Sequence, residues 1–307
     1  MFLCLADGNR SEVLRRILEE RMPEITFAER ESGVDPHAVR FMLTWEQPVH
    51  LADLYPNLEV LFCIGAGVDH FAFDSLPSRL RVVRMVEPGL TEQMQHYAVM
   101  GVLTLARDLP AYQAQQRECI WRQLPSRTPA SLCVSVMGLG HIGRAVLEAL
   151  RQFGYRLRGW SRTPHVIEGV DCYSGPEELP RFLAETNILI CLLPLTDETR
   201  GLLSVETLST LPRGASVINM ARGAHLVQEA VVTLLDSNHL DRVILDVTDP
   251  EPLPPQNPLW KHERVIITPH IAGNTIMESA AGYIIANLDR YRKGLLLDGE
   301  VDRHKGY

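Results

Sequence analysis

The sequence predicts an α/β protein with two doubly wound domains, each built around a parallel sheet. The chain has 307 residues, which is enough for two domains of ordinary size. Short apolar runs alternate with helical patterns along most of its length, as in parallel sheets covered by helices. A glycine-rich turn joins one of these apolar runs to a helix near the middle of the chain.

The first hundred residues contain apolar runs that we interpret as buried parallel strands, because Val, Ile, Leu and Phe fill them. These runs are Phe2–Leu5, Phe41–Trp45, Val60–Ile64 and Val82–Val86. Ser11 is expected to cap the start of a helix on which Leu14, Ile17 and Leu18 share one face. One long helical stretch is then predicted over Thr91–Arg117.

A second series of strands and helices begins after residue 130. Its predicted strands are Leu132–Met137, Arg156–Trp160, Ile188–Leu192, Ser216–Asn219, Val243–Asp246 and Val265–Ile267. A final helix over Met277–Lys293 is expected to return to the first series. We therefore expect one domain of residues 99–274, inserted into another formed by residues 1–98 and 275–307.

Composition and charge exclude several classes of protein. A net charge of -8 argues against general affinity for nucleic acid or anionic membranes. The six cysteines show no Cys-x-x-Cys pair and no zinc-like spacing, so we expect a reducing compartment and no metal site. No basic region opens the chain, and no apolar run approaches the ~18–20 residues of a membrane helix. We expect a cytoplasmic protein.

The glycine-rich turn has the spacing of a dinucleotide site. Its residues are Gly138, Leu139, Gly140, His141, Ile142 and Gly143. The first glycine allows the tight turn, the second lets a pyrophosphate approach the backbone, and the third allows close packing of helix on strand. A plain glycine-rich turn is the alternative, but the strand–turn–helix context favours a cofactor site at the start of the helix.

The end of the next strand indicates which nicotinamide cofactor is bound. An NAD site usually carries an acid there, whereas this strand ends in Ser161, Arg162 and Thr163. Arg162 could pair with a 2′-phosphate, and the two hydroxyls could donate to it. The sequence therefore favours NADPH, the alternative being that Arg162 is a solvated surface residue.

Three polar residues follow successive strands of the second series, where open α/β sheets bind ligands. Arg222 could hold a carboxylate and polarise a ketone, and His270 could protonate the developing alkoxide. Glu251 could orient His270 and stabilise its imidazolium form. Each residue alone has an ordinary structural explanation, but together they suit the reduction of a 2-oxo acid.

Several motifs follow one another along the chain. They are Gly65–Asp69, Gly138–Gly143, Asn219–Gly223, Asp246–Pro254, Pro258–Trp260 and Thr268–His270, with the endings Val301–Arg303 and Gly306–Tyr307. In this order, the motifs resemble the D-2-hydroxyacid dehydrogenase family over essentially the whole chain. Within that family they are most similar to the glyoxylate/hydroxypyruvate reductase A branch.

The resemblance implies a flavodoxin-like substrate domain, an inserted Rossmann cofactor domain and a homodimer. It also implies that Arg222, Glu251 and His270 form the catalytic triad. The substrate-binding residues it implies are Trp45, Ala66, Gly67, Val68 and Arg222. For Trp45 the alternative of an ordinary buried tryptophan stays open.

The cofactor-binding residues that the resemblance implies include the glycine turn, the end of the following strand and several later strand ends. They are Gly138, Leu139, Gly140, His141, Ile142, Gly143, Ser161, Arg162, Thr163, Leu193, Pro194, Met220, Ala221 and Asp246. His96, Thr248 and Asn274 depart from the family pattern, at positions that bear on substrate preference and packing.

The hypothesis from the sequence is NADPH-dependent reduction of glyoxylate to glycolate and of hydroxypyruvate to D-glycerate. Hydride would reach C2 of the substrate, with His270 as the proton donor. One alternative is a dehydrogenase acting on a bulkier 2-oxo acid such as phenylpyruvate. The other is a non-catalytic, nucleotide-sensing protein similar to a corepressor, although the triad is complete.

Overall fold

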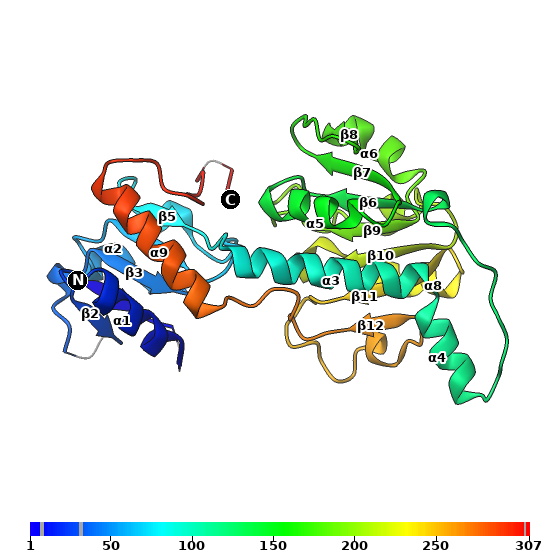
Figure 1. The fold of residues 1–307 in the computed structure, drawn as a ribbon, viewed down its shortest axis with the longest axis horizontal. Helices are drawn as coiled ribbons and strands as arrows, with labels where there is room; N and C mark the ends of the chain where they lie inside the picture. Colours follow the sequence, from blue (N-terminus) through cyan, green and yellow to red (C-terminus); the bar gives the residue numbers. More distant parts are fainter. Residues whose placement is uncertain (7–8, 31–32, 304) are drawn as a thin grey trace. The chain divides into compact units, whose positions relative to one another are not determined.

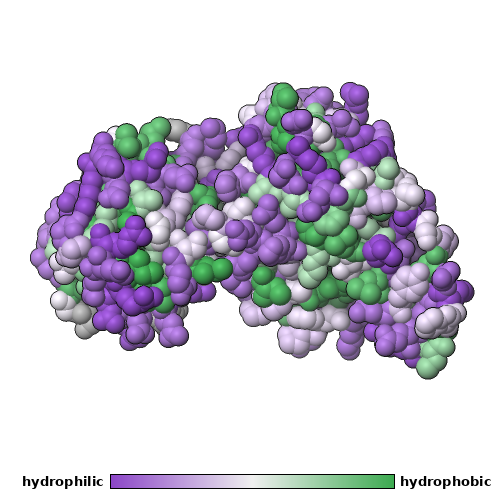
Figure 2. Space-filling model, viewed as in Figure 1, coloured by the Kyte–Doolittle hydropathy of each residue, from purple (hydrophilic) through white to green (hydrophobic). Residues whose placement is uncertain are grey.

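The computed structural model describes residues 1–6, 9–30, 33–303 and 305–307 (Figure 1). They form two compact units, one of Met1–Thr91 with Asn274–Tyr307 and one of Glu92–Gly273. Each unit contains a parallel sheet with helices, which confirms the predicted fold class. In Figure 2, hydrophilic residues cover much of the visible surface of both units. Among the described residues, no helix is long and apolar enough to span a membrane.

The first unit contains a five-stranded sheet in the order β2-β1-β3-β4-β5, with every neighbouring pair parallel. Its strands are β1 (Phe2–Cys4), β2 (Phe27–Glu29), β3 (Phe41–Thr44), β4 (Val60–Cys63) and β5 (Arg81–Val83). Its helices are α1 (Asn9–Arg21), α2 (Leu51–Leu54) and α9 (Met277–Arg292). Helices α1 and α9 lie side by side, so the end of the chain completes the unit that its beginning starts.

One expectation about α1 is wrong. Ser11 does not precede the helix, because α1 already begins at Asn9. The Ser11 side chain is buried, on a helix whose Leu14 and Leu18 also face the core. A small polar residue on the packed face of the helix gave the same signal as a capping residue at its start.

The second unit contains a seven-stranded sheet in the order β12-β11-β10-β9-β6-β7-β8, again parallel throughout. The strands are β6 (Cys133–Met137), β7 (Arg156–Ser161), β8 (Asp171–Ser174), β9 (Ile188–Cys191), β10 (Ala215–Asn219), β11 (Leu240–Leu245) and β12 (Val265–Ile267). The helices after the first strand are α5 (His141–Arg151), α6 (Gly175–Leu183), α7 (Val205–Leu208) and α8 (Gln228–Asp236). All residues of β6, β9 and β10 are buried, so these strands form the centre of the sheet.

The single helix predicted over Thr91–Arg117 is instead two helices, α3 (Pro88–Ala106) and α4 (Leu109–Arg117). Asp108, between them, has a left-handed backbone with φ 54°. Pro110 lacks an amide proton and is tolerated in the first turn of a helix but not in its interior. The proline therefore starts a new helix, and the chain changes direction just before it.

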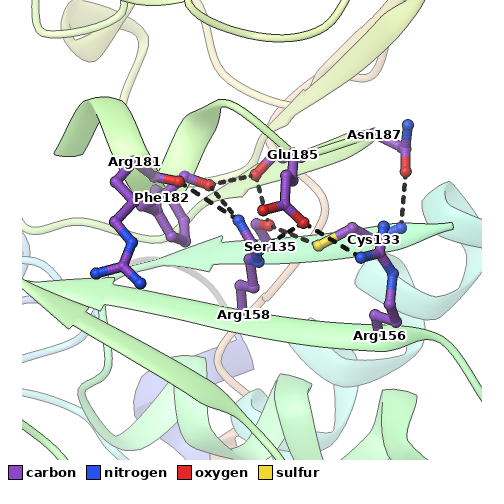
Figure 3. Close-up of polar contacts among 9 residues, drawn as sticks. Cys133, Ser135, Arg156, Arg158, Arg181, Phe182, Glu185 and Asn187 are labelled. Atoms are coloured by element: carbon purple, nitrogen blue, oxygen red, sulfur yellow. Dashed lines mark hydrogen bonds and ion pairs between the residues drawn. The ribbon is translucent and has the colours of Figure 1, made fainter. Parts of the chain in front are cut away.

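A cluster of polar side chains lies near the amino ends of central strands in the sheet of the second unit (Figure 3). The buried Arg158 pairs with Glu185 at 2.8 Å and stacks its guanidinium on Tyr173, 5.4 Å from the ring centroid. It also donates to the Phe182 carbonyl in the last turn of α6, where the helix dipole is negative. The polar side chains at the amino ends of these strands thus find their partners within the protein. The candidate site lies at the opposite, carboxyl ends of the strands.

Candidate active site

The turn after β6 forms the first part of the candidate site. Gly138 has φ +101°, and a Cβ there would lie 2.5 Å from the Leu192 carbonyl oxygen. A Cβ on Gly143 would lie 1.8 Å from the Gly138 carbonyl oxygen, whereas nothing lies within 4 Å of one on Gly140. Gly140 also provides no capping side chain for α5. The turn therefore combines tight packing with open space at the start of a helix, as a phosphate site requires.

Arg144, on α5, connects this turn to the segment after β7, a contact that the sequence did not indicate. Its Nε donates to the Leu139 carbonyl at 3.0 Å, and Nη2 lies 2.8 Å from Nδ1 of His165. Because arginine can only donate, Nδ1 of His165 accepts. Burial, together with the Arg144 charge, lowers the pKa of His165, so the imidazole is neutral in this contact.

The end of β7 contains the residues that the sequence associates with the cofactor ribose. Ser161 is buried and donates from its hydroxyl to the Thr163 carbonyl at 2.8 Å, so it shapes the loop. Arg162 and Thr163 are exposed. Arg162 is thus placed where it could reach a ligand from a loop that Ser161 folds.

The two residues that the sequence suggests as an acid–base pair are in contact after the later strands of the sheet. Nδ1 of His270 lies 2.8 Å from Oε2 of Glu251, and about two-fifths of each side chain is exposed. The second oxygen of Glu251 accepts from the Thr248 amide at 3.0 Å. Glu251 is therefore held from its own loop while it contacts the histidine, and Thr248, which departs from the family pattern, contributes its backbone to that arrangement.

Asp246 holds the loop that carries His270. Its carboxylate is 2% exposed and accepts from the Ile271 and Ala272 amides, at 2.9 and 2.8 Å. The Asp246 carbonyl accepts from the His270 amide at 2.8 Å. His270 itself has a left-handed backbone with φ 53°. The loop therefore turns around the buried Asp246, which accepts from the backbone amides of the histidine and of the two residues after it.

Tyr97, on α3, completes this arrangement and was not identified from the sequence. The Thr268 hydroxyl donates to Asp246 at 2.6 Å, and the Tyr97 hydroxyl lies 2.6 Å from the same Thr268 oxygen. Since the Thr268 proton is directed to the carboxylate, Tyr97 donates to Thr268. Burial raises the pKa of Tyr97 to about 12, which keeps the phenol protonated for this role. A buried aromatic residue on a helix gives no sequence signal of such a function.

The loop of Arg222 packs directly on the loop of Glu251. A Cβ on Gly223 would lie 2.0 Å from the carbonyl carbon of Thr248, so only glycine allows this approach. The buried Asn219 donates from Nδ2 to the Arg222 carbonyl at 2.9 Å, and Arg222 donates from Nη1 to the Ala221 carbonyl at 2.9 Å. The structure thus brings the predicted arginine loop beside the predicted acid.

His225 links the Arg222 loop to the strand end of β9. Its ring nitrogens lie 3.1 Å from the Arg222 carbonyl oxygen and 3.2 Å from that of Pro194, and its side chain is fully buried. Leu193 and Met220 are also buried. His225 therefore connects Pro194, a predicted cofactor residue after β9, to the loop after β10 that contains the predicted residues Met220 and Ala221.

The remaining predicted residues lie in the first unit. Trp45 follows β3 and is 44% exposed, so the alternative of an ordinary buried tryptophan is wrong. Ala66 and Gly67, in the turn after β4, are partly exposed. Val68 is buried in the core, which leaves only its backbone for contact with a ligand. The predicted site residues thus form two groups, one within each unit.

Comparison with known proteins identifies relatives along the whole chain. Residues 99–272 match the family model described as D-isomer specific 2-hydroxyacid dehydrogenase, NAD binding domain. A curated glyoxylate/hydroxypyruvate reductase A of Salmonella paratyphi B is 38% identical over 296 residues, which cover 94% of each protein.

Solved structures give the same result. The D-isomer specific 2-hydroxyacid dehydrogenase of Xanthobacter autotrophicus Py2, in complex with NADPH and MES, is 38% identical with a TM-score of 0.95. The similarity covers 100% of this chain and 99% of that one. The NADPH-dependent glyoxylate/hydroxypyruvate reductase of Sinorhizobium meliloti, in complex with NADP and sulfate, is 30% identical with a TM-score of 0.91, over 100% and 99% of the two chains.

Proposed function

Because the chain belongs to the D-isomer specific 2-hydroxyacid dehydrogenase family, we propose that it uses NADPH to reduce glyoxylate to glycolate and hydroxypyruvate to D-glycerate. The observation that carries this proposal is the contact of His270 with Glu251 at 2.8 Å, beside the loop of Arg222. An imidazole paired with a carboxylate can donate a proton to the ketone oxygen of a 2-oxo acid as it becomes an alkoxide. An arginine next to this pair can hold the carboxylate of the same substrate.

The second unit fits a phosphorylated dinucleotide. Gly140 leaves open space at the amino end of α5, where free amides and the helix dipole favour pyrophosphate. Arg162 would pair with a 2′-phosphate. Leu139, His141 and Ile142 of the turn, Thr163 after β7 and the strand-end residues Leu193, Pro194, Met220, Ala221 and Asp246 would line the rest of the cofactor site. When bound, the reduced nicotinamide supplies hydride for C2 of the substrate.

In the proposed mechanism, the amides of Ala66 and Gly67 receive the substrate carboxylate. Arg222 also binds this carboxylate and polarises the ketone oxygen. His270, with Nδ1 on Glu251, donates the proton on Nε2 to that oxygen as it becomes an alkoxide. Glu251 stabilises the imidazolium form and so keeps the proton available. Trp45 limits the space beside the carboxylate.

The proposal includes the organisation of the chain. Residues 1–98 and 275–307 form the substrate domain, and residues 99–274 form the NADP-binding domain. A homodimer is supported by apolar side chains exposed after α4, since Ile120 is 43% and Trp121 101% exposed. We expect the protein to act in the cytoplasm.

Steady-state oxidation of NADPH over a panel of small and bulky 2-oxo acids tests the activity. We expect His270→Ala and Arg222→Ala each to lower kcat by a factor of about 100 or more. The control is His262→Ala, which removes another histidine–carboxylate pair, the one with Asp236 at 3.4 Å. Near-normal turnover in either site variant would contradict the assigned roles.

The same assay tests the choice of cofactor, the choice of substrate and the alternative of a protein without catalytic activity. A higher kcat/KM with NADPH than with NADH is expected, and a clear NADH preference would overturn the cofactor assignment. A preference for phenylpyruvate over glyoxylate would favour the bulky-acid dehydrogenase. Cofactor binding without turnover of any 2-oxo acid would favour the corepressor-like binding protein.

A further inference from the structure

The indole of Trp45 lies directly on the turn after β4. A Cβ on Gly65 would be 2.6 Å from Cζ3 of the indole and 3.5 Å from Cε3. The ring therefore occupies the space that any side chain at position 65 would fill. Gly65 directly precedes Ala66 and Gly67, whose amides receive the substrate carboxylate in the proposed function. The orientation of this ring thus determines how much room a substrate has there.

His70 contacts Trp45 in two ways. The imidazole stacks on the indole, with ring centroids 4.3 Å apart and planes inclined by 27°. Its Nε2 is also 2.6 Å from the Trp45 carbonyl oxygen. A carbonyl oxygen can only accept, so Nε2 carries a proton and donates it. One side chain thus holds both the ring and the backbone of Trp45.

His70 is also an exposed residue, but its ring contacts two buried residues of the core. Phe71, which is 5% exposed, meets the imidazole edge-on with centroids 4.7 Å apart. The Sγ atom of the buried Cys63 lies 3.9 Å from Nε2. Trp45, at 44% exposed, has much of its surface outside the core, so its rotamer depends on the few groups that touch it. His70, which stacks on the indole, and Gly65, which the indole covers, are two of these groups.

We propose that His70 is a positioning residue that holds the Trp45 indole on Gly65 and thereby restricts the site to 2-oxo acids with small substituents. The inference rests on the proposed function, because it uses the turn at Ala66 and Gly67 as the carboxylate site. It goes beyond that function by naming the residue that sets the size limit. Removal of His70 frees the indole to turn away from Gly65 and admits a larger group.

The first test compares kcat/KM for glyoxylate and phenylpyruvate in the wild type and in His70→Ala. We expect the ratio of the two values to fall by about tenfold, through KM, with kcat for glyoxylate retained within about threefold. His70→Phe keeps an aromatic ring but cannot donate, so its ratio should lie between the two. His50→Ala, at an exposed histidine of the same unit, should leave the ratio unchanged.

The second test observes Trp45 itself and does not depend on turnover. Its fluorescence is obtained as the difference between each protein and the same protein carrying Trp45→Phe. We expect acrylamide to quench this emission about two to three times more strongly in His70→Ala, because the indole leaves its stacked position. A quenching constant equal to that of the wild type overturns the positioning role. Stronger quenching with unchanged substrate selectivity overturns the role in specificity.

The two tests also separate this inference from the proposed function. If the wild type reduces no 2-oxo acid, the proposed function fails and the specificity role fails with it. The quenching measurement still decides whether His70 holds Trp45.

Discussion

The two units contain glycine turns that are packed in opposite ways. In the second unit the turn after β6 packs backbone against backbone, since a Cβ on Gly143 would lie 1.8 Å from the Gly138 carbonyl oxygen. In the first unit the turn after β4 packs against a side chain. The three atoms nearest to a Cβ on Gly65 all belong to Trp45.

This difference separates a rigid part of the candidate site from an adjustable one. A backbone fixed by a sheet and a helix cannot move away, whereas the far end of an indole can rotate. Under the proposed function, the rigid turn binds the phosphates, which are the same in every turnover. The adjustable turn binds the substrate, whose size depends on which 2-oxo acid enters the site.

The largest effect is expected for Gly143→Ala. The added methyl group would overlap backbone atoms that α5 and β6 hold in place, so we expect a loss of more than about 3 kcal/mol in the free energy of unfolding. Urea denaturation measures it. In Gly140→Ala, in the same turn but with nothing within 4 Å of the methyl group, the change should stay within about 0.5 kcal/mol. Equal stability of the two variants would disprove the backbone packing.

Gly140→Ala should instead weaken cofactor binding. Its methyl group enters the space assigned to the pyrophosphate, so we expect the Kd for NADPH to rise by about tenfold or more, with unchanged Tm. Calorimetric titration measures the Kd. Gly282→Ala on α9 is a matched control, since it also has open space but lies in the other unit. An unaltered Kd in Gly140→Ala would place the phosphates elsewhere.

Intermediate effects are expected where a glycine faces a side chain, whichever unit it lies in. A Cβ on Gly159 of β7 would meet Cδ2 of Leu139 at 2.6 Å, the distance at which one on Gly65 meets Trp45. We expect Gly65→Ala and Gly159→Ala each to cost about 1–3 kcal/mol in unfolding free energy, less than Gly143→Ala. Suppose that Gly159→Ala lost as much unfolding free energy as Gly143→Ala. Contact with a side chain rather than with backbone would then not explain the difference between the turns.

The smallest effect concerns the C-terminal segment of the first unit, where Glu300 pairs with Arg81 of β5. The Arg81 hydrogen bond lowers the pKa of Glu300, so the folded protein binds this proton more weakly than the unfolded chain. The pair therefore stabilises the fold above the ordinary carboxylate pKa, and this contribution disappears as the pH falls through the lowered value. Glu300→Gln should cost up to about 1 kcal/mol at neutral pH.

Thermal unfolding of wild type and Glu300→Gln across the acid range tests this dependence. The difference between them should shrink as the pH falls. A difference that is constant with pH would mean that the charge of Glu300 contributes nothing.

The central strands were predictable because they are continuous apolar runs, and the edge strand β12, an apolar run as well, agrees with its predicted range of Val265–Ile267. Two edge strands were not predicted, β2 and β8, since they are short and include polar, partly exposed residues. The break between α3 and α4 was also missed, although Pro110 could have indicated it. Strands without a continuous apolar run, and the ends of helices, depend on neighbours that a local pattern does not contain.

The candidate site shows the same limit. Arg222, Glu251 and His270 follow strands, so topology alone could group them. Tyr97 and His70 act through contacts with residues far along the chain or across a turn, at Thr268 and Trp45. No spacing rule connects such pairs, and only the folded structure reveals them.

The buried carboxylate of Asp246 has a consequence for how this site could change. His270 receives its backbone geometry from Asp246 and its charged partner from Glu251, two acids with separate surroundings. Position 251 could therefore be substituted without removing the contacts that shape the backbone of the histidine loop. A lineage, or an engineer, could replace the partner of the His270 ring at that position while the loop that carries the ring stays intact.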